Sequence, residues 1–227
     1  MRLHNLVIGH RGRPISSALS AELGAGDFVC LVGRNGSGKT TLLRTLAGLL
    51  PPVAGSVLPP ADAGTVEAPA VVLTTVPELH NTSVSDLVAY GRLSQGGVFG
   101  RLHGADRKAA HRAIQQVGIL PLADRLFHRL SDGEKQKAMI AMALAQGRAT
   151  LLLDEPSAFL DYPSRCELMS LLQRIAHEDR KAVLLSTHDL ELARGCADQL
   201  WLLRDGELHV FRTPTDFDVQ AFGLADA

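Results

Sequence analysis

The chain has 227 residues, of which 46% are hydrophobic, and a formal net charge of −1. This size and composition are typical of one large globular domain, or of one domain with an inserted subdomain, and the balanced charge argues against a nucleic-acid partner. The three cysteines are widely spaced, form no metal-ligand pattern and suit a reducing compartment, and no apolar run is long enough to cross a membrane.

The first part of the chain predicts a small β-layer followed by a strand and a helix. Two short apolar stretches, 3–8 and 15–23, are separated by Gly-Arg-Pro. The apolar run Phe28–Val32 then predicts a buried strand, and Thr41–Gly48 predicts a helix. The start of the sequence has no apolar segment typical of a signal peptide, so we expect a cytosolic protein.

The segment between this strand and this helix matches the P-loop, or Walker A, pattern G-x-x-x-x-G-K-[ST]. Its glycines allow backbone N–H groups to surround phosphate oxygens, and the helix that follows directs its positive end at them. We expect Lys39 to reach the β- and γ-phosphates of ATP and the Thr40 hydroxyl to bind Mg²⁺. The candidate ATP-binding residues here are Gly33, Arg34, Asn35, Gly36, Ser37, Gly38, Lys39, Thr40 and Thr41.

The middle of the chain changes from strands to helices. The stretch 51–69 is rich in proline and glycine and predicts loop with one short strand at 55–58, and 70–75 predicts the next buried strand. Helices are then predicted at 83–91, 106–117 and 131–146, with a glycine-rich loop at 94–104. We therefore expect a helical subdomain at 79–148, inserted between the core segments 1–78 and 149–227.

The third of these helices begins with a capping box, in which Ser131 is the N-cap and Glu134 the third helical residue. Its exposed start presents N–H groups, a hydroxyl and the positive end of the helix dipole, all of which favour an anion. The same pattern also describes an ordinary, well-capped helix start, and both interpretations can hold together.

The strands resume with Thr150–Leu153, which is followed directly by Asp154 and Glu155 in a Walker B pattern. A parallel sheet binds ligands at the carboxyl ends of its strands, which places these two acids beside the P-loop. We expect Asp154 to hold Mg²⁺ and Glu155 to orient an attacking water. The remaining predicted elements are a helix at 164–177, a strand at 182–187 that ends at His188, a short helix capped by Asp189, and a hairpin at 200–211 around Asp205-Gly206.

Five segments together resemble the ATP-binding-cassette (ABC) ATPases, in that family's order and spacing, over roughly residues 3 to 213. Besides the two Walker motifs, 130–136 (LSDGEKQ) resembles the family's signature, 156–161 its D-loop and 186–189 its switch-histidine segment. The resemblance implies an α/β fold: a P-loop NTPase (RecA-like) core, an N-terminal antiparallel β-layer and an inserted helical subdomain.

The resemblance also implies how the site is shared. Two copies of the chain would sandwich two ATP molecules, with Ser131 and Gly133 of one copy facing the γ-phosphate held by the other. Asp132 and Glu134 depart from the family's glycine and glutamine and complete this signature set. Asp161 belongs to the D-loop, and His188 would contact the γ-phosphate and couple it to the attacking water.

Two further positions depart from the family pattern. His10 stands where the family has an aromatic residue that stacks on adenine; an imidazole can stack less extensively, and whether His10 does so stays open. No glutamine occurs between 70 and 80, where the family has one that touches Mg²⁺ and contacts the membrane partner. Thr74 or Thr75 lies nearest to that position.

The segments 87–92, 98–102 and 106–107 resemble importers of ferric siderophores, haem and cobalamin. This implies an ATP-hydrolysing subunit that is peripheral at the cytoplasmic face of the membrane and docks on a permease. A periplasmic or surface substrate-binding protein would be an indirect partner, and the cargo is chosen by those partners. The alternatives are a soluble ABC ATPase without a transport role and an exporter subunit.

Overall fold

The core of the protein is a six-stranded sheet with the strand order β11-β10-β5-β9-β8-β7. The computed structural model describes residues 1–59, 67–75, 77–93, 102–213 and 217. All neighbouring strands of this sheet are parallel except the hairpin of β10 and β11. The strands are β5 (Phe28–Val32), β7 (Ala70–Val72), β8 (Thr150–Asp154), β9 (Ala182–Ser186), β10 (Gln199–Arg204) and β11 (Glu207–Phe211).

The central strands are buried on both faces, which explains their continuous apolar sequences. Successive residues of β5 alternate between two cores: Cys30 and Val32 belong to one, Val29 and Leu31 to the other. The first core contains the helices α5 (Tyr162–Glu178) and α6 (Leu190–Cys196), and the second contains α1 (Lys39–Leu46). The sheet is therefore covered by helices on both sides, as expected from its sequence.

A second, three-stranded antiparallel sheet, β4-β1-β6, packs on the α1 side. It consists of β1 (Arg2–Val7), β4 (Leu19–Glu22) and β6 (Ala54–Leu58), and a short pair, β2 (Gly9–His10) and β3 (Arg13–Pro14), lies beside it. The expected N-terminal β-layer is confirmed, and the short strand predicted at 55–58 is its third member.

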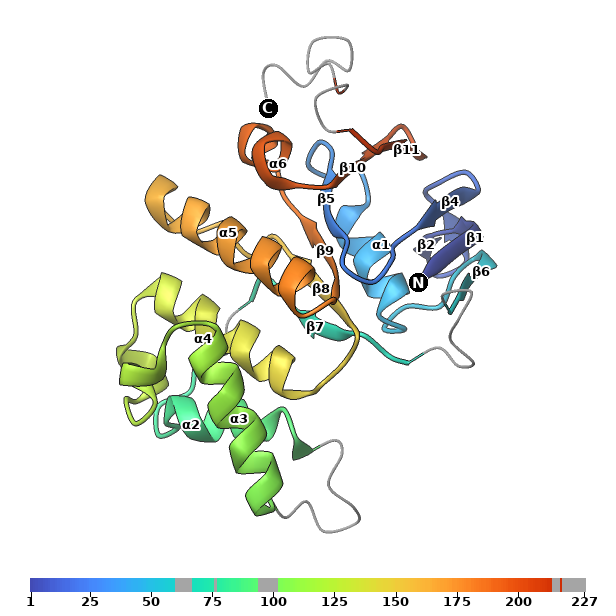
Figure 1. Ribbon diagram of the computed structural model, residues 1–227. Coiled ribbons are helices and arrows are strands. Elements are labelled where there is room, and N and C mark those ends of the chain that lie inside the picture. The colour runs from blue at the N-terminus through green and yellow to red at the C-terminus, as the bar shows by residue number, and fades with distance from the viewer. Residues whose placement is uncertain (60–66, 76, 94–101, 214–216, 218–227) are drawn as a thin grey trace.

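The helices α2 (Val84–Tyr90), α3 (Gly104–Gln116) and α4 (Asp132–Ala145) pack against one another and lie at the opposite end of the molecule from the small sheet (Figure 1). Two 3₁₀ turns, η2 (Leu120–Leu122) and η3 (Phe127–Arg129), connect α3 to α4. Among the described residues, no helix combines the length and the apolar character that crossing a bilayer requires. The predicted loop at 94–104 falls largely outside the described residues, and its last residue, Gly104, begins α3.

Several predicted boundaries need correction. The helix predicted at 41–48 is α1, which begins at Lys39 and ends at Leu46. The strand predicted at 70–75 ends at Val72. Thr74 lies beyond it and contacts the Asp154 main-chain oxygen through its side chain. The helix predicted from residue 106 begins at Gly104, and His103 is its N-cap. The helix predicted from residue 164 begins at Tyr162, since Asp161 caps it and Pro163 fits its first turn.

Candidate functional site

The loop between β5 and α1 brings backbone donors together at a helix start that no side chain caps. Gly33 has φ +154°, and a Cβ there would lie 2.4 Å from the main-chain oxygen of Leu203, so only glycine fits. Gly38, with φ 105°, is the N-cap of α1; its cap position has no side-chain hydrogen bond, and the first turn has no acidic residue. The buried Ser37 Oγ finds no hydrogen-bond partner among the described residues. These are the features of an anion site.

Lys39, the first residue of α1, is buried at the base of this loop. Its Nζ donates hydrogen bonds to the main-chain oxygens of Gly33, at 2.8 Å, and Arg34, at 3.3 Å. It also lies 3.9 Å from Glu155 Oε1. Burial lowers the pKa of Lys39, and the nearby carboxylates of Glu155 and Asp154 partly offset this by favouring the charged amine.

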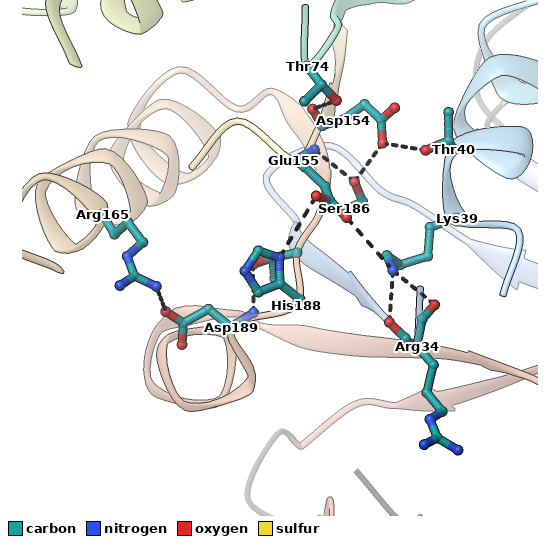
Figure 2. A network of polar contacts seen from close by, with 12 residues as sticks. Arg34, Lys39, Thr40, Thr74, Asp154, Glu155, Arg165, Ser186, His188 and Asp189 are labelled. Carbon is teal, nitrogen blue, oxygen red and sulfur yellow. Dashed lines mark hydrogen bonds and ion pairs between the residues drawn. The ribbon is translucent and has the colours of Figure 1, made fainter. Parts of the chain in front are cut away.

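Asp154, at the end of β8, lies next to the P-loop. Its Oδ1 accepts a hydrogen bond from Thr40 Oγ1 at 3.1 Å and another from Ser186 Oγ at 2.8 Å. Figure 2 shows these contacts converging from α1, β8 and β9. The parallel pairing of β8 with β9 sets Asp154 directly opposite Ser186.

Glu155 turns its carboxylate toward both Lys39 and His188. Its φ of +46° is left-handed, which is uncommon for a residue with a side chain. Its N–H donates to Ser186 Oγ at 2.9 Å, and its Oε2 lies 3.8 Å from His188 Nδ1. The structure thus brings Lys39, Thr40, Asp154, Glu155 and His188 together, from parts of the chain that are far apart in sequence.

The switch-histidine segment is tied to α5. His188 is half-exposed, and Asp189 caps α6 by accepting from the Leu192 N–H at 3.1 Å. Arg165 Nη1 of α5 contacts Asp189 Oδ2 at 2.9 Å (Figure 2). Asp161, in the D-loop-like segment, caps α5, and the hydrogen bonds that it accepts from the hydroxyl and N–H of Ser164 lower its pKa.

The signature-like residues form a separate cluster at the start of α4. Ser131 Oγ accepts from the Glu134 N–H at 3.3 Å, and Glu134 Oε2 accepts from the Ser131 N–H at 2.8 Å, which confirms the capping box. Asp132 Oδ1 lies 3.2 Å from Lys135 Nζ, and Gly133 lies near Leu160 of the D-loop-like segment. The helix α4 packs in the core that contains α5, whereas the P-loop helix α1 packs in the other core.

The remaining candidates lie at the edges of the site. His10 Nε2 lies 3.0 Å from Thr41 Oγ1, so the exposed imidazole is held against α1. Thr74 Oγ1 donates to the main-chain oxygen of Asp154 at 2.8 Å. Thr75 is exposed and, with Glu155, lines a cleft of about 650 Å³ between the segment that follows β7, the start of α4 and the D-loop-like segment.

The oxygen groups present fit a magnesium ion that is shared with phosphates. Mg²⁺ is usually held by one or two protein oxygens together with phosphate oxygens and water. The Thr40 hydroxyl and the Asp154 carboxylate, which touch one another, supply such a pair. The described residues contain no group of three or more His, Cys, Asp or Glu that could hold a metal by protein ligands alone.

Sequence reasoning placed Ser186 in the switch-histidine segment but gave it no role, whereas in the structure it contacts both acidic residues. Its side chain is fully buried, although it immediately precedes a polar loop. The sequence signals available were its place in that segment and at the end of an apolar strand. The pairing of this strand with β8, which creates the contacts, is not visible in sequence order.

Comparisons with known proteins agree with this geometry. The protein-family model described as "ABC transporter" matches residues 17–158. Iron(3+)-hydroxamate import ATP-binding protein FhuC of Bacillus subtilis is 34% identical over 208 residues, covering 88% of this chain and 77% of that protein. Hemin import ATP-binding protein HmuV of Bordetella bronchiseptica is 37% identical over 232 residues, covering 95% and 87%.

Solved structures give the same result. A metal-chelate type ABC transporter in an inward-facing conformation matches with a TM-score of 0.88 and 26% identity, over 98% of this chain and 87% of that chain. A dimeric bacterial ABC transporter cassette matches with a TM-score of 0.75 and 25% identity, over 92% and 96%.

Proposed function

The chain belongs to the ABC transporter family, and we propose that it is the ATP-hydrolysing subunit of an importer for iron–siderophore, haem or cobalamin-type compounds. The observation that carries this proposal is the 34–37% identity to import ATP-binding proteins for iron hydroxamate and haem over most of the chain. A cobalamin import protein of Halobacterium salinarum is 36% identical over 87% of this chain and 51% of that protein.

In the proposed reaction, the P-loop binds the phosphates of ATP. Backbone N–H groups at the start of α1, the Ser37 hydroxyl and the Lys39 amine face the same anion. Thr40 and Asp154 would hold Mg²⁺, which neutralises charge on the phosphates when bound. The Thr41 hydroxyl positions His10, which stacks on the adenine.

Hydrolysis is a direct attack by water, to which the protein contributes positioning and charge. Glu155 orients this water and accepts its proton, since its carboxylate stands at the end of the Walker B strand and is turned toward both Lys39 and His188. His188, at 3.8 Å from that carboxylate, contacts the γ-phosphate and links it to the water. The strained backbone of Glu155 fits a catalytic position of this kind.

The site is completed by a second copy of the chain. Ser131 and Gly133 of that copy face the γ-phosphate, and Asp161 lies in the loop between the two sites. Support comes from the similarity to a dimeric cassette and from the separation of the signature-like residues from the P-loop core. The regions 1–78 and 149–227 act as the core, and 79–148 acts as the helical subdomain.

The dimer docks on a membrane permease, at the cytoplasmic face, and a substrate-binding protein delivers the cargo to that permease. The cleft lined by Thr75 and Phe159 is the proposed contact, because it joins the segment after β7 to both the signature and the D-loop. The importer-like segment 87–92 offers less surface for such a contact. Its residues Leu87, Val88 and Ala89 are buried, and Tyr90 is exposed. The predicted match at 98–101 lies outside the described residues.

Thr74 and Thr75 take over part of the role of the glutamine that the family has here. Thr74 is bonded to the Asp154 main chain, so it transmits movement of this segment to the Walker B strand, and Thr75 contributes its hydroxyl through water. Alanine at both positions should impair transport coupling more than ATP binding. Normal transport by this double variant would remove both threonines from the mechanism.

Co-purification and reconstituted transport test the importer proposal. The chain should be recovered from membranes with a polytopic permease, cross-link to it from Thr75, and drive ATP-dependent uptake of an iron chelate in proteoliposomes. Recovery with only soluble partners would favour a non-transport ATPase, and ATP-driven movement out of the cytoplasmic side would favour an exporter. Sequencing the genes beside this one narrows the cargo.

A further inference from the structure

Ser186, the last residue of β9, is an uncharged polar residue whose side chain is fully buried within the site. Its hydroxyl donates to Asp154 Oδ1 at 2.8 Å and accepts from the Glu155 N–H at 2.9 Å. One hydroxyl therefore contacts the two acidic residues at the same time (Figure 2).

The bond to Asp154 fixes the orientation of a carboxylate. Oδ1 accepts from both Ser186 and Thr40, and these two donors approach from β9 and α1. A carboxylate that is held by two donors has little freedom to rotate, whereas one that is held by Thr40 alone can turn about its side-chain bond. Ser186 thus sets the orientation in which the Asp154 carboxylate faces the P-loop.

The bond to Glu155 fixes a strained piece of backbone. A left-handed conformation is unfavourable for a non-glycine residue, because Cβ approaches the following carbonyl oxygen, and Glu155 adopts it with φ +46°. The hydrogen bond from its N–H to Ser186 compensates part of that cost, and it fixes the peptide that aims the Glu155 side chain. That carboxylate lies 3.9 Å from Lys39 Nζ and 3.8 Å from His188 Nδ1.

We propose that Ser186 is a positioning residue for ATP hydrolysis, which orients the Asp154 carboxylate and holds the Glu155 main chain in its left-handed conformation. It transfers no proton and touches no phosphate; it acts through its two neighbours. The inference rests on the proposed ATPase activity of this site.

The test compares Ser186→Ala with Ser186→Thr, which retains the hydroxyl, and with Thr45→Val as a matched control. Thr45 is also a buried hydroxyl, but it donates to the main-chain oxygen of Thr41 within its own helix, at 2.8 Å. Displacing catalytic groups by about 1 Å can cost on the order of 100-fold in rate. We therefore expect Ser186→Ala to lower kcat by about 10- to 100-fold with KM for ATP nearly unchanged, and Ser186→Thr to restore most of it.

A second readout does not depend on turnover. With a non-hydrolysable ATP analogue bound, the affinity for Mn²⁺, followed by its electron paramagnetic resonance signal, should fall in Ser186→Ala and stay unchanged in Thr45→Val. Binding of a fluorescent ATP analogue in EDTA should be the same in all variants. Thermal unfolding should show comparable losses in Ser186→Ala and Thr45→Val, which separates positioning from general destabilisation.

Three results would overturn the inference: wild-type kcat in Ser186→Ala, an equal loss of kcat in Thr45→Val, or an Mn²⁺ affinity that does not respond to Ser186→Ala. The first and third leave the proposed function intact, provided that the wild type hydrolyses ATP in a Lys39-dependent way. Absence of Lys39-dependent hydrolysis in the wild type would instead overturn both.

Discussion

The two helix starts that we propose to meet the same ATP are built in opposite ways. The start of α1 has a glycine N-cap, no side-chain cap and no acid in its first turn, and its first residue is Lys39. The start of α4 has Ser131 as N-cap, a complete capping box, and the acids Asp132 and Glu134 in its first turn. The backbone N–H groups at the start of α1 have no side-chain acceptor, whereas the capping box at the start of α4 supplies side-chain acceptors for part of its N–H groups.

This difference indicates how the two helix starts contribute to ATP binding. Unpaired N–H groups and a positive dipole end make α1 an anion site in a single copy of the chain. At α4 the same groups are partly occupied, and two carboxylates lie nearby, so this end attracts phosphate more weakly. ATP should therefore bind tightly to the P-loop of one copy, and the signature of the other copy should join only in the closed dimer.

Lys39→Ala should abolish ATP binding at the start of α1, and we expect it to have the largest effect of all the variants. The triphosphate would lose its main cation in a buried position, so tight ATP binding and hydrolysis should fall to background. Binding of a fluorescent ATP analogue and phosphate release measure this. The control is Arg44→Ala, which removes an exposed cation from the same helix and should behave as wild type. Unchanged affinity and turnover in Lys39→Ala would rule out the P-loop as the ATP site.

Glu155→Gln separates binding at α1 from closure onto α4. The proposed ATP-binding groups remain, but the carboxylate that we propose to orient the water is lost, so hydrolysis should slow by about 10²–10⁴-fold while ATP still binds. Closed dimers should then accumulate on size-exclusion chromatography with ATP. A wild-type rate in this variant would place the catalytic carboxylate elsewhere.

Adding Ser131→Arg to Glu155→Gln should abolish that dimer, because the arginine would fill the place of the nucleotide contact at α4. ATP binding to the separate copies should persist. A stable ATP-dependent dimer of the double variant would contradict the shared-site arrangement.

The contrast between the two helix starts could be predicted from the sequence, because each start is determined by residues that are close together in the chain. The P-loop pattern and the S-x-x-E box each involve residues within eight positions, and runs such as Phe28–Val32 show burial on both faces. Strand existence, most helices and the pairing of Asp154 with the P-loop followed from these patterns together with the parallel-sheet rule.

What the sequence could not show depends on which strands lie side by side. Ser186 reaches Asp154 only because β9 lies between β5 and β8, an order that differs from the chain order. The early end of β7 at Val72 likewise depends on a contact 80 residues away, between Thr74 and the Asp154 main chain. The left-handed conformation of Glu155 has no signature in its residue type.

Glu134→Gln should make the start of α4 a better anion site and so reduce its difference from the start of α1. Glutamine preserves the capping box and removes one negative charge from the side that faces ATP. In a solvated interface, one charge a few ångströms away is worth about 1 kcal/mol. The closed dimer contains two such sites, so the ATP-dependent dimer should tighten by roughly 30-fold. Measured in the Glu155→Gln background, this appears as a lower protein concentration at half-dimerisation.

Asp132→Asn is the matched control for that variant. It makes the same change of charge two residues away in the same first turn, but the carboxylate is exposed and already paired with Lys135. Its effect on the dimer should be smaller. Equal effects of the two variants would mean that net charge, and not the position of Glu134, controls closure.

The smallest expected effect is a pH dependence of stability that comes from α4 and has no counterpart at α1. The hydrogen bond from the Ser131 N–H is the main cause that lowers the pKa of Glu134 below its usual value. Burial opposes it as the second-largest effect, and the Ser131 hydroxyl, Arg125 and Lys137 each lower the pKa further. Because the folded-state pKa is the lower one, this charge stabilises the fold above the unfolded-state pKa, about 4.3. The stabilisation is lost as the pH falls through the folded-state pKa.

The measurement is the difference in unfolding free energy between wild type and Glu134→Gln, by urea, at pH 7 and near pH 4. At pH 7 the wild type should be more stable by on the order of 0.3 kcal/mol, the low end for an exposed charge at a helix start, and high salt should reduce this. The difference should shrink near pH 4, as Glu134 begins to take up a proton. A difference that stays the same at both pH values would show that the cap holds Glu134 by its shape alone. Any difference in stability between the two side chains would then come from their shape and hydrogen bonding, and the charge of Glu134 would contribute nothing to it.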